Sequence, residues 1–196
     1  MSRRTLRVPL ALAFLAAVLT AEPTHGGDIL GIYTDSAGTG GPYLDISTGS
    51  ATVYLVLTNI SRPCGICGWE CRLDGDWDTN PNISYMGDTL HGPQAINVYA
   101  FPEYAVGMDC LGQDPNGNIW LASWTFLFLA PETMHLYLGP CNNPMIPGLM
   151  VYLDSDNVDM LWPMYPSSGS FDLPVFGFNP VPAQSTSFGQ LKACYR

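Results

Sequence analysis

The chain has 196 residues, of which 47% are hydrophobic and only 12% are charged, and its formal net charge is −10. Acidic residues outnumber basic ones 17 to 7. Such a surface repels phosphate backbones and anionic lipid head groups, which argues against nucleic acid and peripheral membrane partners. The length suits a single domain with its own core.

The first 26 residues have the features of an export signal. A basic start, MSRRTLR, precedes the apolar run VPLALAFLAAVL at residues 8–19. This run is about 12 residues long, whereas a membrane-spanning helix needs about 20. A retained anchor is therefore the weaker alternative, and we expect cleavage after Ala21 or Gly26. The mature chain, with four basic and 16 acidic residues (net charge −12), is expected to be secreted, extracellular or periplasmic, without membrane insertion.

Beyond residue 26 the chain predicts one short β-strand after another. Apolar or alternating runs occupy residues 29–34, 51–58, 68–73, 95–100, 119–129, 134–138, 149–153 and 173–178. The intervening segments, such as GDWDTNPN and CNNPMIPG, are rich in turn residues. About ten short strands without sustained helical periodicity predict an all-β fold, a single antiparallel β-sandwich. We expect the sandwich over residues 27–178 and a polar connector with a final strand or tail over 179–196.

Alternation indicates which side chains face the core. In residues 51–58 one face holds Ala51, Val53, Leu55 and Leu57. In residues 68–73 Trp69, Cys71 and Leu73 share a face, opposite Glu70 and Arg72. In residues 119–129 the alternation predicts one continuous row of core side chains, formed by Trp120, Ala122, Trp124, Phe126 and Phe128.

Six cysteines follow the export signal, and an even count outside the cytosol predicts disulfides. They are Cys64, Cys67, Cys71, Cys110, Cys141 and Cys194. The preferred pairs are Cys110 with Cys141, and two of the first three with each other or with Cys194. A zinc site is the alternative for the C-x-x-C-x-x-x-C cluster, but the histidines His91 and His135 belong to no matching motif. A redox C-x-x-C is disfavoured because no helix follows the cluster.

Two acidic segments are candidate calcium sites, because carboxylates at alternate loop positions can converge on one ion. The first contains Asp74, Asp76, Asp78 and Asn80, and the second contains Asp154, Asp156, Asn157 and Asp159. The first matches the opening of an EF-hand loop but has Thr79 where that loop needs Gly and Tyr85 where it needs Glu. The alternative is that these aspartates sit in solvated turns at strand ends, a position they favour.

The tryptophans raise the question of carbohydrate binding, since aromatic faces stack on sugar rings. Most of the five share a face with core residues, which leaves Trp77 and Trp162 as the candidate ligand-binding side chains. Trp77 lies within the first acidic segment, so a sugar site there would be calcium-dependent. A single exposed aromatic residue is also common on ordinary surfaces.

The sequence contains little that points to catalysis. No G-x-S-x-G elbow, P-loop or HExxH motif is present. His91 lies in a Gly-containing loop, and His135 lies within a predicted strand. Paired carboxylates of a glycoside hydrolase are possible in principle, but Glu70, Glu103 and Glu132 have no distinguishing context. We therefore expect a protein that is not an enzyme.

The chain resembles two groups of proteins. Over residues 53–129 the strand VYLVLTN, the strand GWECRLD before an acidic loop, and the apolar strand GNIWLASWTFLFL resemble cohesin-like sandwich domains, which implies an Ig-like or cohesin-like jelly roll. The inserted CGIC and the other cysteines depart from that pattern. The blocks GIYTD, LYLGP, MVYLDSD and MYPSSGSFDLPVF are similar to uncharacterised exported bacterial proteins, which implies a stand-alone exported sandwich. Neither resemblance carries functional residues to this chain.

The sequence therefore predicts a secreted, disulfide-stapled, non-catalytic sandwich module with a protein-interaction or surface-structural role. A calcium-dependent carbohydrate-binding module is the alternative, with Ca²⁺ as its cofactor. A hydrolase with an unrecognised carboxylate pair is the third hypothesis. The expected partner is an extracellular protein or a polysaccharide.

Overall fold

The computed structural model describes residues 27–62, 65–157 and 159–180. The expected export signal and residues 181–196 lie outside this range, and so do Cys64 and Cys194. No helix in the described ranges is long and apolar enough to cross a membrane. The strands are β1 (Asp28–Tyr33), β2 (Tyr43–Leu44), β3 (Gly49–Thr58), β4 (Ile66–Gly75), β5 (Ile83–Leu90), β6 (Ile96–Asn97), β7 (Glu103–Leu111), β8 (Ile119–Phe128), β9 (Met134–Gly139), β10 (Met150–Asp154), β11 (Leu161–Pro166) and β12 (Phe176–Phe178). A 3-10 turn, η2 (Asp76–Asp78), follows β4.

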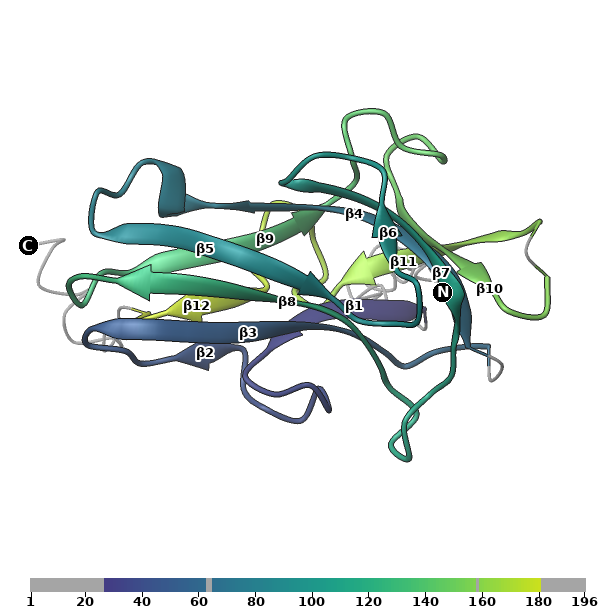
Figure 1. Cartoon of the computed structure of the whole chain (residues 1–196), viewed down its shortest axis with the longest axis horizontal. Coiled ribbons are helices and arrows are strands. Elements are labelled where there is room, and N and C mark those ends of the chain that lie inside the picture. The colour runs from purple at the N-terminus through teal and green to yellow at the C-terminus, as the bar shows by residue number, and fades with distance from the viewer. Residues whose placement is uncertain (1–26, 63–64, 158, 181–196) are drawn as a thin grey trace, which may run out of the picture.

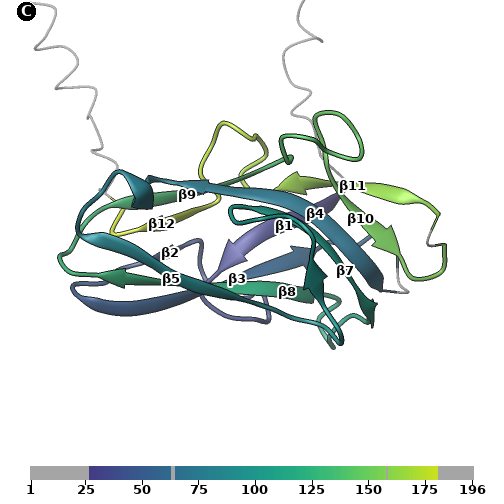
Figure 2. The ribbon, with the colours of Figure 1, turned by 45° about the horizontal axis from the view of Figure 1, so that its top comes forward.

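The strands form one continuous sheet that folds over into two layers (Figures 1 and 2). One layer contains β5, β8, β3 and β1, and the other contains β7, β4, β9, β12 and β2. Strands β10 and β11 connect β4 to β1 and so join the layers. The sheet is not closed, because β2 and β5 form its ends. The all-β sandwich prediction is confirmed, although the ladders β1–β11 and β2–β12 are parallel.

The core lies between the layers, where the predicted inward faces meet. Ala51, Val53, Leu55 and Leu57 of β3 are buried, as alternation predicts. From β4, Trp69, Cys71 and Leu73 enter the same core. One end of the core is filled with aromatic rings, because Phe126 and Phe128 of β8 pack against Phe178 with ring centroids 5.9 and 4.9 Å apart. This burial supplies the main driving force for folding.

One tryptophan of the predicted core row lies outside the core. In β8, Ala122 pairs with Leu55 but Trp120 pairs with Val56, so Leu121 is an extra residue in the ladder. This β-bulge reverses the alternation beyond it, and Leu121 is buried where Trp120 was expected. The Trp120 ring instead stacks on His91, with ring centroids 3.8 Å apart. The prediction that Trp120 belongs to the core row is therefore wrong.

Several strands differ from the sequence prediction. Strands β2, β5, β7 and β11 were not predicted, and β11 carries two prolines within its six residues. Residues 95–100 form only the two-residue β6, because the Asn97 side chain makes hydrogen bonds to the β7 backbone that a longer strand would make through its own backbone. Its Oδ1 accepts the Ala105 amide at 2.8 Å, and its Nδ2 donates to the Glu103 carbonyl at 3.0 Å.

The structure contains a disulfide between Cys67 of β4 and Cys110 of β7. The predicted pairing of Cys110 with Cys141 is therefore wrong. The physical reason is strand pairing: β4 and β7 are antiparallel neighbours with Ile66 opposite Leu111, which brings Cys67 and Cys110 together. Cys141 follows β9 on the other side of β4, where Gly139 pairs with Arg72. The prediction of a disulfide-stapled fold is confirmed.

The Asn179 side chain joins the end of the described chain to the rest of the sandwich by hydrogen bonds. We expect its replacement to destabilise the fold. Its side-chain Oδ1 accepts the Ile46 amide at 2.6 Å, and its Nδ2 donates to the carbonyls of Ile46 and Glu132 at 2.8 and 3.0 Å. Its backbone is left-handed, with φ 44°. Asn179→Ala should lower the free energy of unfolding by about 2–3 kcal/mol, measured by urea denaturation.

Asn179→Gly is the matched control for this prediction. Glycine accepts the left-handed backbone but makes none of the side-chain hydrogen bonds. We therefore expect a smaller loss for Gly than for Ala, and the difference reports the backbone contribution. If both variants are as stable as the wild type, the side-chain hydrogen bonds do not contribute.

Candidate functional site

A small hollow lies on the outer face of the sheet, over β4, β7 and the adjoining strand β10. Its floor is low because three of its residues are small: Gly68, Ala105 and Gly107. Val151 and Leu153 of β10 form one wall. The hollow has a volume of about 160 Å³. A Cβ atom added at Gly107 would meet nothing within 4 Å, so the space above this glycine is open.

The buried carboxylate Glu70 lines this hollow. Its side chain points away from the core, since its neighbours Trp69 and Cys71 face inward, yet only 1% of its surface is exposed. The Glu70 Oε1 atom accepts the Met145 amide at 3.1 Å. Burial raises the pKa of Glu70, the Met145 hydrogen bond opposes this, and the Glu103 carboxylate raises the pKa further. The hollow therefore combines apolar walls with one desolvated acid.

Exposed apolar side chains surround the opening, and we call them the apolar rim: Ile96, Val98 and Met145. Their exposed fractions are 65%, 72% and 60%. Val98 and Met145 line the hollow itself, and Ile96 pairs with Gly107 beside it. The Tyr99 hydroxyl donates to the Asn143 carbonyl at 3.4 Å, which links the segment after β6 to the loop over Glu70. Large apolar side chains gathered around one opening commonly mark an interaction site.

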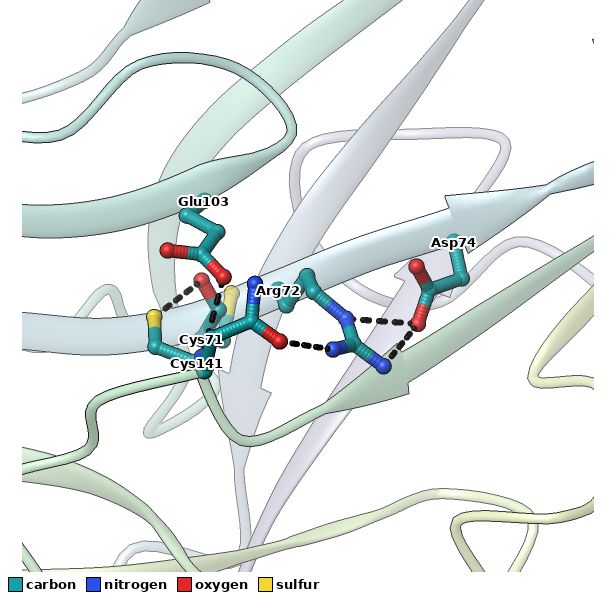
Figure 3. A network of polar contacts seen from close by, with 6 residues as sticks. Cys71, Arg72, Asp74, Glu103 and Cys141 are labelled. Carbon is teal, nitrogen blue, oxygen red and sulfur yellow. Dashed lines mark hydrogen bonds and ion pairs between the residues drawn. The ribbon is translucent and has the colours of Figure 1, made fainter. Parts of the chain in front are cut away.

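A polar network holds the start of this loop against β4 and β7 (Figure 3). The Arg72 guanidinium forms an ion pair with Asp74 at 2.7 Å and donates to the Asn142 side chain at 3.0 Å. The Asn142 amide in turn donates to Glu103 at 2.9 Å. The loop at residues 141–149 is thus fixed at its beginning, which explains how Met145 is held over Glu70.

The structure separates the two acidic segments that the sequence singled out. Asp76 directly follows β4, whereas the Ser155 amide donates to the Gly65 carbonyl just before β4. Strand β4 has ten residues, so the segments are about 30 Å apart at ~3.3 Å per residue (Figure 1). They do not form a common site, and Trp77 does not lie beside the second segment.

Most of the polar side chains in the two segments have partners within the protein. Asp74 pairs with Arg72, and Asp76 accepts the His135 amide at 3.2 Å. The remaining contacts are of the turn type: Asn80 accepts from Asn82, Asp154 from Asp156 and Asn157 from Asp159. Asp78 is exposed. In the part of the chain that the structure describes, no three His, Cys, Asp or Glu side chains are grouped to hold a metal ion. Calcium binding stays a prediction.

Both candidate tryptophans are only partly exposed. The Trp77 ring packs against Phe101 and Phe126, with ring centroids 5.7 and 5.6 Å away, and so closes one end of the core. The Arg62 guanidinium lies 3.8 Å from the centre of the Trp162 ring and covers one of its faces. A ligand-binding role for either residue stays a prediction.

A second hollow, which no sequence pattern reveals, lies near the turn after β7. We call it the polar groove, because Asn59, Gln113, Asn116 and Asn118 line it. Its volume is about 530 Å³. A smaller hollow shares Gln113 and Asn118 with it and is lined by the stacked His91 and Trp120. The sequence signal was the amide-rich turn QDPNGN, which pattern analysis treats only as a turn.

The apolar hollow was also missed. Glu70 was named in the sequence only as an acid without context, because strand alternation places it on the outer face. Alternation does not reveal that a distant loop covers that face. The exposed Val98 lies in a run that was predicted to be a strand, and nothing local distinguishes it from a core residue.

Three comparisons place these observations beside known proteins. No family model and no curated protein matches the chain. Solved structures of cohesin modules match at TM-scores below 0.5. A type II cohesin domain from the cellulosome of Acetivibrio cellulolyticus has TM-score 0.44 and 14% identity, covering 78% of this chain and 95% of that chain. A cohesin module of a Clostridium perfringens family 33 glycoside hydrolase has TM-score 0.39 and 9% identity, covering 71% and 98%. The loose cohesin-like resemblance stated from the sequence is thus confirmed, and it concerns the fold alone.

The raised pKa of Glu70 makes stability depend on pH in a defined direction. Because the folded-state pKa lies above the ordinary glutamate value, this group stabilises the fold at low pH. That contribution is lost as the pH rises through the raised pKa. Glu70→Gln should remove this loss, so the variant should gain stability relative to the wild type between pH 4 and pH 7. Thermal unfolding across this range measures the difference, and a constant difference would contradict the prediction.

Proposed function

We propose that this protein is an exported, non-catalytic module that binds a partner protein through the apolar rim and the hollow behind it. The observation that carries the proposal is the combination of exposed Ile96, Val98 and Met145 with an open, small-residue floor at Gly107. Interfaces between proteins gain most of their binding energy from a few side chains that fill such pockets.

The size of the hollow favours a protein partner over a small molecule. Sites for small ligands usually have volumes of about 300–1,000 Å³. The hollow has about 160 Å³, which is room for one side chain. The apolar rim extends the contact beyond this single side chain, as a protein surface requires and a small ligand does not.

The surroundings of the carboxylates support a non-catalytic role. A glycoside hydrolase needs two carboxylates that both face the scissile bond, one of them able to donate a proton. Glu103 accepts the Asn142 amide and supports the loop, whereas Glu70 accepts the Met145 amide beneath the rim. Export is supported by the Cys67–Cys110 disulfide, because such bonds persist mainly in oxidising compartments.

Two glycine variants, one within the hollow and one outside it, test the proposal. Gly107→Leu fills the hollow, and Gly112→Leu is the control, because a Cβ atom at either position meets nothing within 4 Å. A photo-crosslinker in place of Val98 captures partners from the extracellular fraction of the host, and the captured protein is then purified. Gly107→Leu should weaken its binding at least about tenfold, whereas Gly112→Leu should not. Equal binding by both variants would contradict the proposed surface.

Carbohydrate binding at the polar groove is the second candidate function. It is favoured by four amide side chains beside the partly exposed His91–Trp120 stack. A glycan array with and without EDTA tests this function. Gly112 lines the smaller hollow that shares Gln113 and Asn118 with the groove. Binding that falls with Gly112→Leu and persists with Gly107→Leu would support a sugar site there, and loss with EDTA would show that the site requires calcium. No binding in either condition would exclude this candidate.

A further inference from the structure

We propose that the hollow binds the cationic side chain of a lysine or arginine of the partner protein. The charged group of that side chain would form an ion pair with the Glu70 carboxylate. This inference rests on the proposed function and specifies its chemistry. The key observation is a carboxylate with 1% of its surface exposed that lines an otherwise apolar hollow.

Within the part of the chain that the structure describes, no cationic side chain pairs with Glu70. An ionised carboxylate offers about four acceptor positions, and within the described ranges its hydrogen-bond donor is the Met145 amide. The described ranges contain two cationic side chains other than histidine, and both are engaged elsewhere. Arg72 pairs with Asp74, and Arg62 lies over the Trp162 ring. A buried acid without a counter-charge gains strongly when a cation arrives, because its desolvation has already occurred.

The shape of the hollow fits the same class of side chain. Lysine and arginine combine an apolar stem with a charged head, and the stem packs well on apolar walls. Val98, Val151 and Leu153 supply such walls on the way to Glu70. The overall charge adds a long-range contribution, since a chain of net charge −10 attracts a basic partner surface.

Side-chain mimics test this inference separately from the partner. The amide resonances of Gly107 and Met145 are followed by NMR during titration with n-butylammonium, n-butylguanidinium, n-pentanol and pentanoate. The two cations should give saturable shifts, with affinity at least about tenfold above that of pentanol, and pentanoate should give none. Glu70→Gln should weaken the cations about tenfold or more, Gly107→Leu should abolish their binding, and Gly112→Leu should leave it unchanged.

Two results would overturn the inference in distinguishable ways. If pentanol binds as well as the cations and Glu70→Gln has no effect, the hollow takes an apolar side chain, and the proposed function survives without the cation. If no probe shifts these resonances, the cation site does not exist. The proposed function then depends on whether Gly107→Leu still weakens the captured partner.

A different observation carries a second inference. We infer that Cys71 and Cys141 form a disulfide in the exported protein. Both side chains are buried, and Cys141 Sγ lies 3.2 Å from the Cys71 carbonyl oxygen (Figure 3). Both are free thiols in this structure. Burial raises the pKa of the Cys71 thiol, and the nearby Cys141 raises this pKa further. Adjacent thiols in an oxidising compartment usually pair.

The reaction is ordinary thiol–disulfide exchange. Each thiol loses its proton, the Cys71 Sγ–Cys141 Sγ bond forms, and two electrons reduce the disulfide of an external oxidant to two thiols. Because burial disfavours the thiolate of the folded protein, the exchange is expected before the core closes around Cys71.

Peptide mapping of the exported protein without reductant tests this pairing. Cleavage after Trp69 separates Cys71 from Cys67. The expected product joins the peptides of Cys71 and Cys141, and Cys71→Ala should leave Cys141 open to alkylation after unfolding while Cys67–Cys110 persists. Alkylation of both cysteines in the wild type, or pairing of either with Cys64 or Cys194, would overturn the inference.

Discussion

Replacing both Cys67 and Cys110 by alanine should lower the free energy of unfolding by about 4 kcal/mol. The bond joins residues separated by 43 positions, and closing a loop of this length in the unfolded chain corresponds to about 4 kcal/mol at 25 °C. Cys67 is half-buried and Cys110 is exposed, so the substitution removes little packing. The loss should therefore come mainly from the greater freedom of the unfolded chain. Urea denaturation measures it as a lower midpoint.

The remaining cysteines require a control in this experiment. Peptide mapping of the double variant should show that Cys71 and Cys141 keep the state that they have in the wild type. A loss below about 1 kcal/mol, with that state unchanged, would show that the unfolded chain is already restricted between β4 and β7. The bond would then have little stabilising role.

Trp124→Ala should lower the free energy of unfolding by about 3–5 kcal/mol, the usual loss for a large buried aromatic residue. Trp124 is fully buried, and its Nε1 donates to the Tyr104 hydroxyl at 2.6 Å. Its ring centroid lies 5.8 Å from that of Tyr104, which stacks in turn on Trp69. Removing it opens a cavity where β8 meets β4 and β7 and leaves a buried hydroxyl without this donor.

Trp120→Ala is the matched control, since it removes the same side chain from the same strand. Trp120 is partly exposed and contacts His91 and Tyr54, so we expect a loss of about 1–1.5 kcal/mol. Chemical denaturation of the two variants side by side tests the bulge at Leu121. Losses of equal size would contradict the bulge and restore the continuous core row that simple alternation predicts.

The local sequence predicted much of the fold because strand alternation is a local property. The inward residues of β3 and the buried face of β4 follow from the order of residues within each strand. Prediction failed where contacts with another part of the chain alter which side chains face the core or which residues form a strand. The bulge at Leu121 depends on the register between β8 and β3, and β11 forms despite its prolines because β10 and β1 flank it.

The candidate site shows the same division. Each acidic segment was visible in the sequence, but their separation by the length of β4 was not. Conversely, Glu70 had no distinguishing neighbours along the chain. It becomes a candidate only because Met145, 75 residues later, donates to it from a loop that crosses its strand. Periodicity and composition do not reveal contacts between residues so far apart in the chain.

By itself, the sequence determined that this chain is an acidic, β-rich sandwich stapled by a disulfide, because composition and strand alternation can be read from the residues without knowing their distant contacts. Only the tertiary structure decided which cysteines pair, which tryptophans leave the core, and where a carboxylate meets an apolar opening. These features depend on register and loop placement, which join residues far apart in the chain and are set by the packing of the whole sheet.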